Sequence, residues 1–152
     1  METLQYASKE AVIEAAIGFL EEAGRSYGET LSSPHKTREF LRLRIGAEER
    51  EVFTVIYLNN QHQIIAVEDL FHGTLDGAVV YPREVAKLAL QHNAAAVIFG
   101  HNHPSGVTEP SAADRRITER LCSGLGLLDI RVLDHLIVSE KGSYSFAENG
   151  LI

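Results

Sequence analysis

The chain has 152 residues, of which 45% are hydrophobic and 23% are charged. This balance predicts one folded domain with a buried core; it excludes a disordered chain, and no apolar run approaches the length of a membrane span. The formal net charge is −7, from 14 basic and 21 acidic residues, which disfavours a surface built to bind nucleic acid.

Two features predict a cytosolic protein. The N-terminus lacks the basic stretch and apolar core of a secretory signal. Cys122 is the single cysteine, which leaves no intrachain disulfide and no zinc site made of several thiolates.

The first predicted element is an amphipathic helix over residues 8–24. Ser8 is its expected N-cap and Gly24 its expected end. Its predicted inward-facing stripe comprises Val12, Ala15, Ala16, Phe19 and Leu20. The polar stretch 25–33, which contains Gly and Ser, is the predicted linker to the rest of the chain.

A second helix is predicted over residues 34–45. Ser33 is placed to cap it, Pro34 suits its first position, and Gly46 lies just beyond its end. Four arginines lie in this helix or shortly after it: Arg38, Arg42, Arg44 and Arg50. We interpret them as a solvated helix face, because arginines in such a place are more often solubilising than nucleic-acid binding.

Strands and helices alternate in the remainder of the chain. Residues 52–58 and 64–70 are rich in β-branched and aromatic residues and predict a hairpin. There follow a predicted helix at 81–93, a buried strand at 94–100, a helix at 111–125 and strands at 130–139 and 144–147. This order predicts an α/β domain with three layers, α/β/α, around a mixed central sheet.

The predicted buried strand stops where a His-x-His motif begins. Side chains two residues apart in extended chain point the same way, so His101 and His103 can converge on one ion. Pro104 stiffens the exit and Gly106 allows the loop to turn back, so that Asp114 arrives in the first turn of the next helix. Two imidazoles and a carboxylate are the ligands of a catalytic zinc ion with one coordination position open for water.

Each half of this pattern has an ordinary structural explanation. Ser111 and Asp114 have the spacing of a capping box, and a His-x-His sequence occurs by chance in surface loops. The combination at a strand end is what favours a metal site. Contiguous His101-Asn102-His103 does not fit the HNH nucleases, whose three residues are spread over a ββα unit, and one cysteine excludes the zinc nucleobase deaminases.

The spacing of residues 101–114, His-x-His-Pro, six residues, Ser, two residues and Asp, resembles the motif of the JAMM (MPN+) metalloproteases. The segment HNHPSG is similar to the corresponding segment of the RadC branch of that superfamily. The similarity extends over about residues 33–152 and includes GTLDGAVVYPREVAKLAL and RVLDHLIVS. The resemblance implies a cytidine-deaminase-like α/β/α fold, one Zn²⁺ per chain and hydrolysis of a peptide or isopeptide bond. We therefore divide the chain into an N-terminal helix and linker, 1–30, and a RadC-like JAB/MPN domain, 31–152.

The resemblance also implies two catalytic residues. The family's general base is a glutamate on a strand after the first long helix, a place that Glu51 occupies, and Ser111 matches the serine that would steady the oxyanion. Three other glutamates compete with Glu51 for the role of base: Glu49, Glu68 and Glu84. His135, in the RadC-like RVLDHLIVS, is interpreted as half of a structural polar pair with Asp134, with a contact to a metal ligand as the alternative.

The expected partner is a protein with a peptide or isopeptide bond to cleave. We expect this chain to act in the cytoplasm of a bacterium and to have no membrane partner. A second hypothesis for the function stays open. RadC proteins carry a DNA-repair label, so the chain could act on or near nucleic acid, or as an accessory protein of a mobile element, with a structural metal. The helix-hairpin-helix module of full-length RadC-like proteins has no counterpart in residues 1–30, which weakens this hypothesis.

Overall fold

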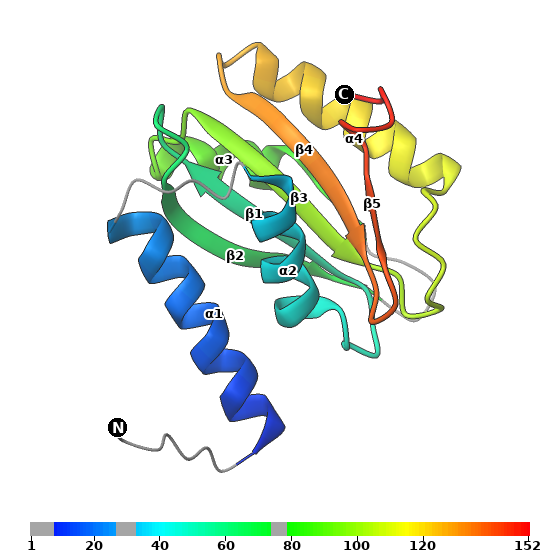
Figure 1. Cartoon of the computed structure of the whole chain (residues 1–152). Helices are drawn as coiled ribbons and strands as arrows, with labels where there is room; N and C mark the ends of the chain where they lie inside the picture. The colour runs from blue at the N-terminus through cyan, green and yellow to red at the C-terminus, as the bar shows by residue number, and fades with distance from the viewer. Residues whose placement is uncertain (1–7, 27–32, 74–78) are drawn as a thin grey trace.

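A five-stranded mixed sheet forms the centre of the computed structural model, which describes residues 8–26, 33–73 and 79–152 (Figure 1). The strands are β1 (Val52–Leu58), β2 (Ile64–His72), β3 (Ala96–Asn102), β4 (Arg131–Val138) and β5 (Ser143–Ser145). They lie in the order β2-β1-β3-β4-β5, and only the β3–β4 pair is parallel. The predicted hairpin and the predicted central strand are therefore confirmed.

Helices cover both faces of this sheet. They are α1 (Lys9–Ser26), α2 (Pro34–Ile45), α3 (Pro82–Gln91) and α4 (Ala112–Gly126). The helix α2, with α1 beside it, packs on one face, and α3 and α4 pack on the other. The predicted three-layer α/β class with a mixed sheet is confirmed. Among the described helices, none has both the length and the apolar composition that crossing a membrane requires.

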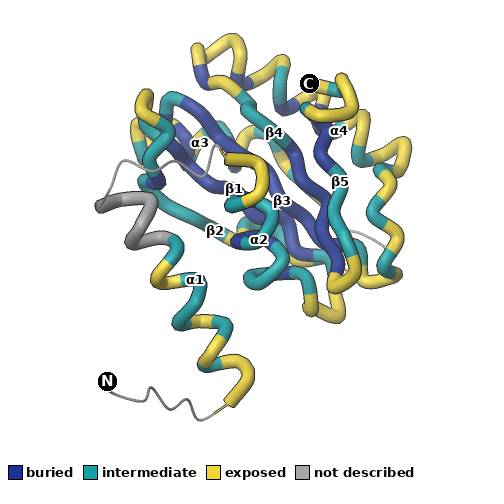
Figure 2. Tube along the Cα trace, in the orientation of Figure 1, coloured by how far each residue is buried: buried dark blue, intermediate teal, exposed yellow. Residues whose placement is uncertain are grey.

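The strand β3 is buried on both sides, as Figure 2 shows. Ala96 and Ile98 join the core under α2, whereas Val97 and Phe99 join the core under α3 and α4. The predicted end of the strand at residue 100 was wrong, because His101 and Asn102 still pair with Ile137 and Val138 of β4. His101 is consequently held by the sheet rather than by a loop.

The helix α1 differs from its prediction in its inward face and in its end. Val12 is 46% exposed and Phe19 59% exposed, while Ile17 and Leu20 pack against the core. The apolar residues of α1 allow two overlapping stripes, and the one that contains Ile17 is used. The Ser8 Oγ accepts a hydrogen bond from the Ala11 N–H, as predicted for an N-cap.

The ends and caps of α1 and α2 agree in part with their predictions. The helix α1 continues through Gly24 to Ser26, and the rest of the predicted linker, 27–32, lies outside the described residues, as do residues 74–78. Pro34 begins α2 and Gly46 follows it, as expected. Ser33 occupies the N-cap position but makes no side-chain cap hydrogen bond; its carbonyl instead accepts from the Thr37 backbone and hydroxyl.

Gly100 brings α2 close to the strand that carries the histidines. A Cβ atom at this position would lie 2.6 and 2.7 Å from the two Cδ atoms of Leu41, which is fully buried in α2. A side chain at position 100 would therefore press α2 away from β3 or force Leu41 out of its rotamer.

We expect Gly100→Ala to lower the free energy of unfolding by about 1–3 kcal/mol, the usual cost of overpacking a core. The matched control is Gly124→Ala in α4, where a Cβ meets nothing within 4 Å and should be neutral or stabilising. In a Leu41→Ala background, Gly100→Ala should cost much less than it does alone, because the shorter side chain leaves room for the added Cβ. Denaturant titrations measure the native protein, the three single variants and the double variant, and equal unfolding midpoints for the two glycine variants would contradict this packing.

Candidate metal centre

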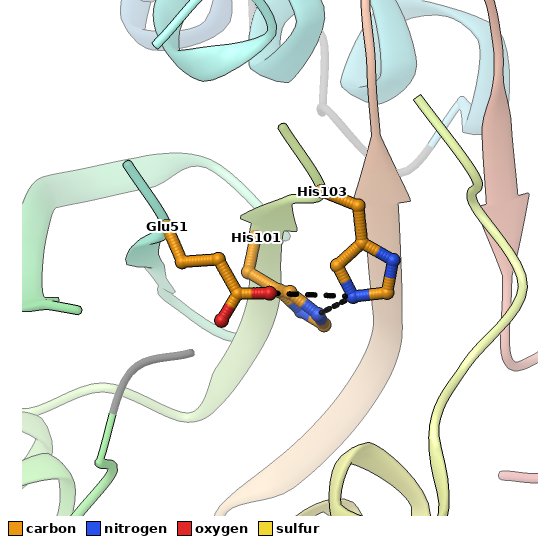
Figure 3. A group of neighbouring side chains, drawn as sticks. All are labelled: Glu51, His101 and His103. Carbon is orange, nitrogen blue, oxygen red and sulfur yellow. Dashed lines mark hydrogen bonds and ion pairs between the residues drawn. The ribbon is translucent and has the colours of Figure 1, made fainter. Parts of the chain in front are cut away.

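Three elements bring their polar side chains to one end of the sheet. The end of β3 supplies His101 and, one residue beyond it, His103; the first turn of α4 supplies Asp114, and the residue before β1 is Glu51. Figure 3 shows Glu51 and the two histidines pointing toward one another. Residues separated by 50 positions in the sequence are thus gathered because β1 and β3 are antiparallel neighbours, with Phe53 opposite His101.

Two imidazoles and one carboxylate converge at this point. The Nε2 atoms of His101 and His103 are 3.0 Å apart, and the Asp114 carboxylate oxygens lie 3.3 Å from the first and 3.2 Å from the second. Two nitrogens bound to one tetrahedral zinc ion stand about 3.3 Å apart, from Zn–N bonds of about 2.0–2.1 Å. The three predicted ligands are therefore brought together at separations that suit a small divalent cation.

Glu51 approaches the same group from the opposite side. Its carboxylate lies 3.6 Å from the Nε2 of His103, and its ligand atom and those of both histidines are all within 4.8 Å of one another. Its three competitors lie elsewhere: Glu49 is exposed after α2, Glu68 pairs with His92, and Glu84 is in the first turn of α3. Two carboxylates thus lie beside the imidazoles, and that of Asp114 is closer to them than that of Glu51.

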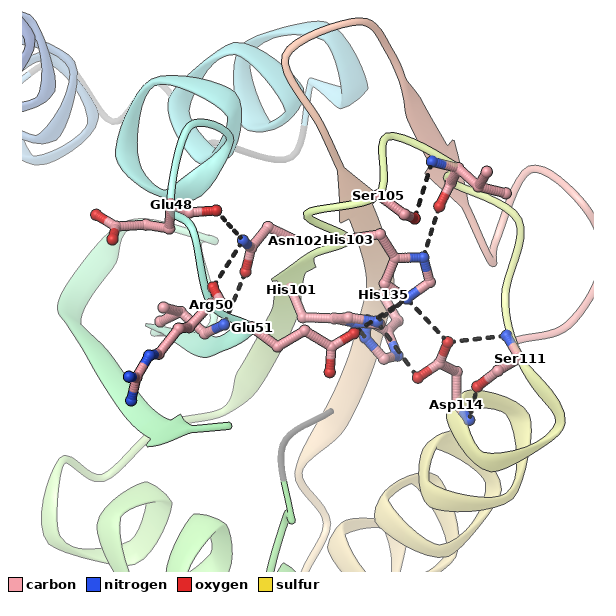
Figure 4. Close-up of polar contacts among 12 residues, drawn as sticks. Glu48, Arg50, Glu51, His101, Asn102, His103, Ser105, Ser111, Asp114 and His135 are labelled. Carbon is pink, nitrogen blue, oxygen red and sulfur yellow. Dashed lines mark hydrogen bonds and ion pairs between the residues drawn. The ribbon is translucent and has the colours of Figure 1, made fainter. Parts of the chain in front are cut away.

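Local hydrogen bonds fix His103 and Asp114. The Nδ1–H of His103 donates to the Val107 carbonyl at 2.7 Å, which leaves Nε2 to face the cluster. The Ser111 N–H donates to the Asp114 carboxylate at 2.8 Å, and the Asp114 N–H donates to the Ser111 hydroxyl at 3.0 Å. The predicted capping box is present, so the bond that opens α4 also orients Asp114 (Figure 4).

The orientation of His101 depends on two residues of a buried chain of hydrogen bonds. The Nδ1 of His101 lies 2.7 Å from the Nε2 of His135, whose Nδ1 lies 2.6 Å from the Thr118 hydroxyl. That hydroxyl donates to the Asp114 carbonyl at 2.7 Å, so it accepts from His135, and His135 accepts from His101. The proton shared by the two imidazoles therefore lies on the Nδ1 of His101.

The interpretation of His135 and Asp134 as a polar pair is wrong for the imidazole, although the His135 backbone N–H does donate to the Asp134 carboxylate at 2.7 Å. Asp134 bonds to the Ser145 hydroxyl and to backbone N–H groups, while the fully buried His135 ring contacts His101. Burial, together with the nearby His101, holds the pKa of His135 well below its ordinary value, so its ring is neutral. A neutral imidazole has one donor and one acceptor, as the chain of hydrogen bonds requires.

The cluster keeps its carboxylate ionised. Burial alone raises the pKa of Asp114, but hydrogen bonds to His101 and His103 outweigh it and hold that pKa well below its usual range. Burial acts to lower the pKa of His103, and the bonds to Asp114 and Val107 raise it above its ordinary value. A cation would therefore meet an ionised carboxylate, and the raised pKa of His103 makes a proton a stronger competitor for that imidazole.

A cavity of about 190 Å³ opens beside the cluster. Its polar wall consists of Glu51, His101, Asp114 and His135, and its apolar wall of Phe53, Val80, Ala113 and Ile117. Ala113 and Ile117 lie one turn apart on α4, so the same helix supplies Asp114 and part of the apolar wall.

Known proteins are similar to the chain over most of its length. The model of the "RadC-like JAB domain" family matches residues 31–151. UPF0758 proteins are similar to the chain: that of Cellvibrio japonicus is 56% identical over 147 residues, and that of Vibrio campbellii 52% identical over 148, each over 97% of this chain. The chain spans 65% and 66% of the length of these curated relatives, whose names state no activity and no substrate.

We expect Thr118→Val to weaken the binding of Zn²⁺ by about tenfold, because outer partners of metal ligands typically contribute 10–100-fold to affinity. The substitution preserves shape but removes the hydroxyl that links Asp114 to His135. Thr54→Val is the matched control: Thr54 is equally buried, and its hydroxyl bonds to Asp69 on β2. Competition with a zinc-binding dye measures both affinities, and equal affinities in the two variants would contradict this role for the hydrogen-bond chain.

Proposed function

Because the chain belongs to the RadC-like JAB domain family, we propose that it is a zinc-dependent hydrolase of the JAMM type that cleaves a peptide or isopeptide bond. The family lies within a superfamily whose members are often hydrolases. The observation that carries the proposal is the convergence of His101, His103 and Asp114 beside a second carboxylate, Glu51, at the wall of a cavity.

The proposed ligands are the two Nε2 atoms and the Asp114 carboxylate. When bound there, a zinc ion supplies a Lewis acid that polarises a carbonyl and lowers the pKa of a coordinated water to about 7. Asp114 is assigned as ligand and Glu51 as base because the Asp114 oxygens are nearer to both imidazoles than Glu51 is to His103. The Glu51 carboxylate then lies at the cavity wall, outside the proposed set of ligands.

Proton transfer falls to Glu51 in this proposal. Its carboxylate accepts a proton from the attacking water and later donates it to the leaving amine. Ser111 serves the carbonyl oxygen: its hydroxyl oxygen accepts from the Asp114 N–H, and its own hydrogen remains to donate to a developing oxyanion. Both residues keep a catalytic role in this proposal because they flank the proposed ligands (Figure 4).

The substrate is proposed to be a protein or peptide with an amide bond in reach of the cavity. The apolar wall of Phe53, Val80 and Ile117 would exclude water from the reacting groups and accept an apolar part of the substrate. A cytoplasmic bacterial setting is part of the proposal, and the bacterial relatives support its bacterial part.

The alternative function, an accessory role near nucleic acid with a structural metal, receives less support from the arginines. Arg38 pairs with Glu148, Arg44 pairs with Asp69, and Arg42 bonds to Glu39 and to two carbonyls. Three of the four candidate phosphate contacts are therefore engaged within the domain, and the net charge of −7 opposes a polyanion.

We expect the purified protein to contain about one zinc ion per chain. His103→Ala and Asp114→Asn should lose the metal. Glu51→Gln should retain it but lose about 10²–10⁴-fold in hydrolysis, the usual contribution of a general base. Glu49→Gln is the matched control, since it changes an exposed carboxylate two residues away and should alter neither property. Elemental analysis measures the zinc, and fluorogenic peptide and isopeptide substrates measure hydrolysis.

Three outcomes of this experiment would count against the proposal. If Glu51→Gln lost zinc while Asp114→Asn kept it, the two carboxylates would have exchanged roles. If the chain held zinc but Glu51→Gln and the native protein were equally inactive on every substrate, the structural-metal alternative would be favoured. Absence of stoichiometric metal after purification without chelators would overturn the metal centre itself.

A further inference from the structure

Asn102, the residue between the two histidines, is fully buried and faces the other side of the sheet. Successive side chains of a strand alternate between its two faces. His101 therefore points toward α4 and the cavity, while Asn102 points toward the side on which α2 packs. The loop 46–51, which connects α2 to β1 and ends at Glu51, passes on that side.

The Asn102 side chain makes three hydrogen bonds, and all of them reach the backbone around Glu51. Its Nδ2 donates to the Arg50 carbonyl at 2.9 Å and to the Glu48 carbonyl at 3.2 Å. Its Oδ1 accepts from the Val52 N–H at 2.7 Å. Figure 4 shows the amide between these groups, so the residues immediately before and after Glu51 are both tied to one side chain.

These bonds continue the sheet beyond its last backbone pair. The register of β1 against β3 ends at Phe53 opposite His101. One step further, the Asn102 amide takes the place of a strand backbone and satisfies the Val52 N–H and the Arg50 carbonyl. The Glu51 carbonyl is held separately by the Gly73 N–H at 2.8 Å. The backbone of Glu51 is consequently fixed on both sides although it lies outside any strand.

We propose that Asn102 is a positioning residue that sets the Glu51 backbone and so directs its carboxylate at the two histidines. The two histidines of the His-Asn-His segment then face the metal centre, while the asparagine between them holds the loop that ends at Glu51. The catalytic part of this inference rests on the proposed function, whereas the positioning of Glu51 does not.

The first test needs no substrate. In Asn102→Ala, amide hydrogen exchange of residues 48–52 should become faster, because the Val52 N–H loses its acceptor. Asn59→Ala is the matched control: Asn59 also makes three side-chain hydrogen bonds, in the turn at the far end of β1, and its loss should affect residues 59–63 instead. Unchanged exchange at residues 48–52 in Asn102→Ala would overturn the proposal.

The second test asks whether Asn102 acts through Glu51. In the Co²⁺-loaded protein, Glu51→Gln should shift the pH at which the visible absorption changes, because it removes a charge beside the ion. Asn102→Ala should shift that pH in the same direction, and Asn59→Ala should leave it in place. A pH profile of Asn102→Ala that coincides with the native one, or a shift in the opposite direction, would contradict the assignment.

The third test measures catalysis. Asn102→Ala should lower kcat by about 100-fold, the effect of displacing a catalytic group by about 1 Å, with KM and zinc content unchanged. In the Glu51→Gln background it should cost no more than about twofold further, since two residues that act through one step are not additive. Fully additive losses would mean that Asn102 acts on something other than Glu51.

An isosteric variant covers the case in which the alanine variant does not fold. Asn102→Asp retains the acceptor for the Val52 N–H but replaces both donors with an oxygen that the Glu48 and Arg50 carbonyls repel, so it should lower kcat and shift the Co²⁺ profile relative to the native protein. Equality with the native protein in both would overturn the proposal. If the native protein hydrolyses no substrate, the proposed function fails, yet the exchange and Co²⁺ measurements still decide the positioning of Glu51.

Discussion

The alternation of side chains at the end of β3 is the constraint on which the site depends. The strand is buried on both faces and pairs with neighbours on both sides, so its backbone has no freedom to rotate. Extended chain in such a place must send His101 to one face and Asn102 to the other. A single short segment therefore supplies a candidate ligand to one layer and a buried hydrogen-bonding group to the other.

Each group that converges on the site is held by a partner of a different kind. His101 is held by the ring of His135, His103 by the Val107 carbonyl, and Asp114 by the backbone N–H of Ser111. Groups fixed in this way lose little entropy when a ligand arrives, and the Nε2 atoms of both imidazoles already face the centre. The cluster also places two carboxylates next to two imidazoles, a charge that a divalent cation would balance.

Local sequence signals were sufficient for the elements and for the candidate ligands. The apolar run before His101, Pro34 at a helix start and the Ser111–Asp114 capping box are short-range features, and each was found from the sequence. The resemblance to the RadC branch, carried by the residues around His101, is confirmed by the family match and by relatives at 51–56% identity. The roles assigned to Glu51, Ser111 and the three ligands stay predictions.

Long-range register was what the sequence could not supply. His135 meets His101 because β4 runs parallel to β3 with His135 opposite Phe99, a register that no local pattern in RVLDHLIVS states. Thr118 could have been found, since it lies one helical turn after Asp114 and shares its face. Asn102 was overlooked because its partners are backbone atoms of the distant residues 48–52. The face of α1 was mistaken because its apolar residues fit two stripes equally well.

The most direct test of the metal centre is a crystal structure of the zinc-loaded protein with anomalous diffraction recorded at the zinc absorption edge. We expect one anomalous peak bonded to the Nε2 atoms of His101 and His103 and to the Asp114 carboxylate, at about 2.0–2.2 Å, with Glu51 outside bonding distance. A peak bonded to Glu51 in place of Asp114, or a zinc ion bound elsewhere with these side chains empty, would contradict this assignment.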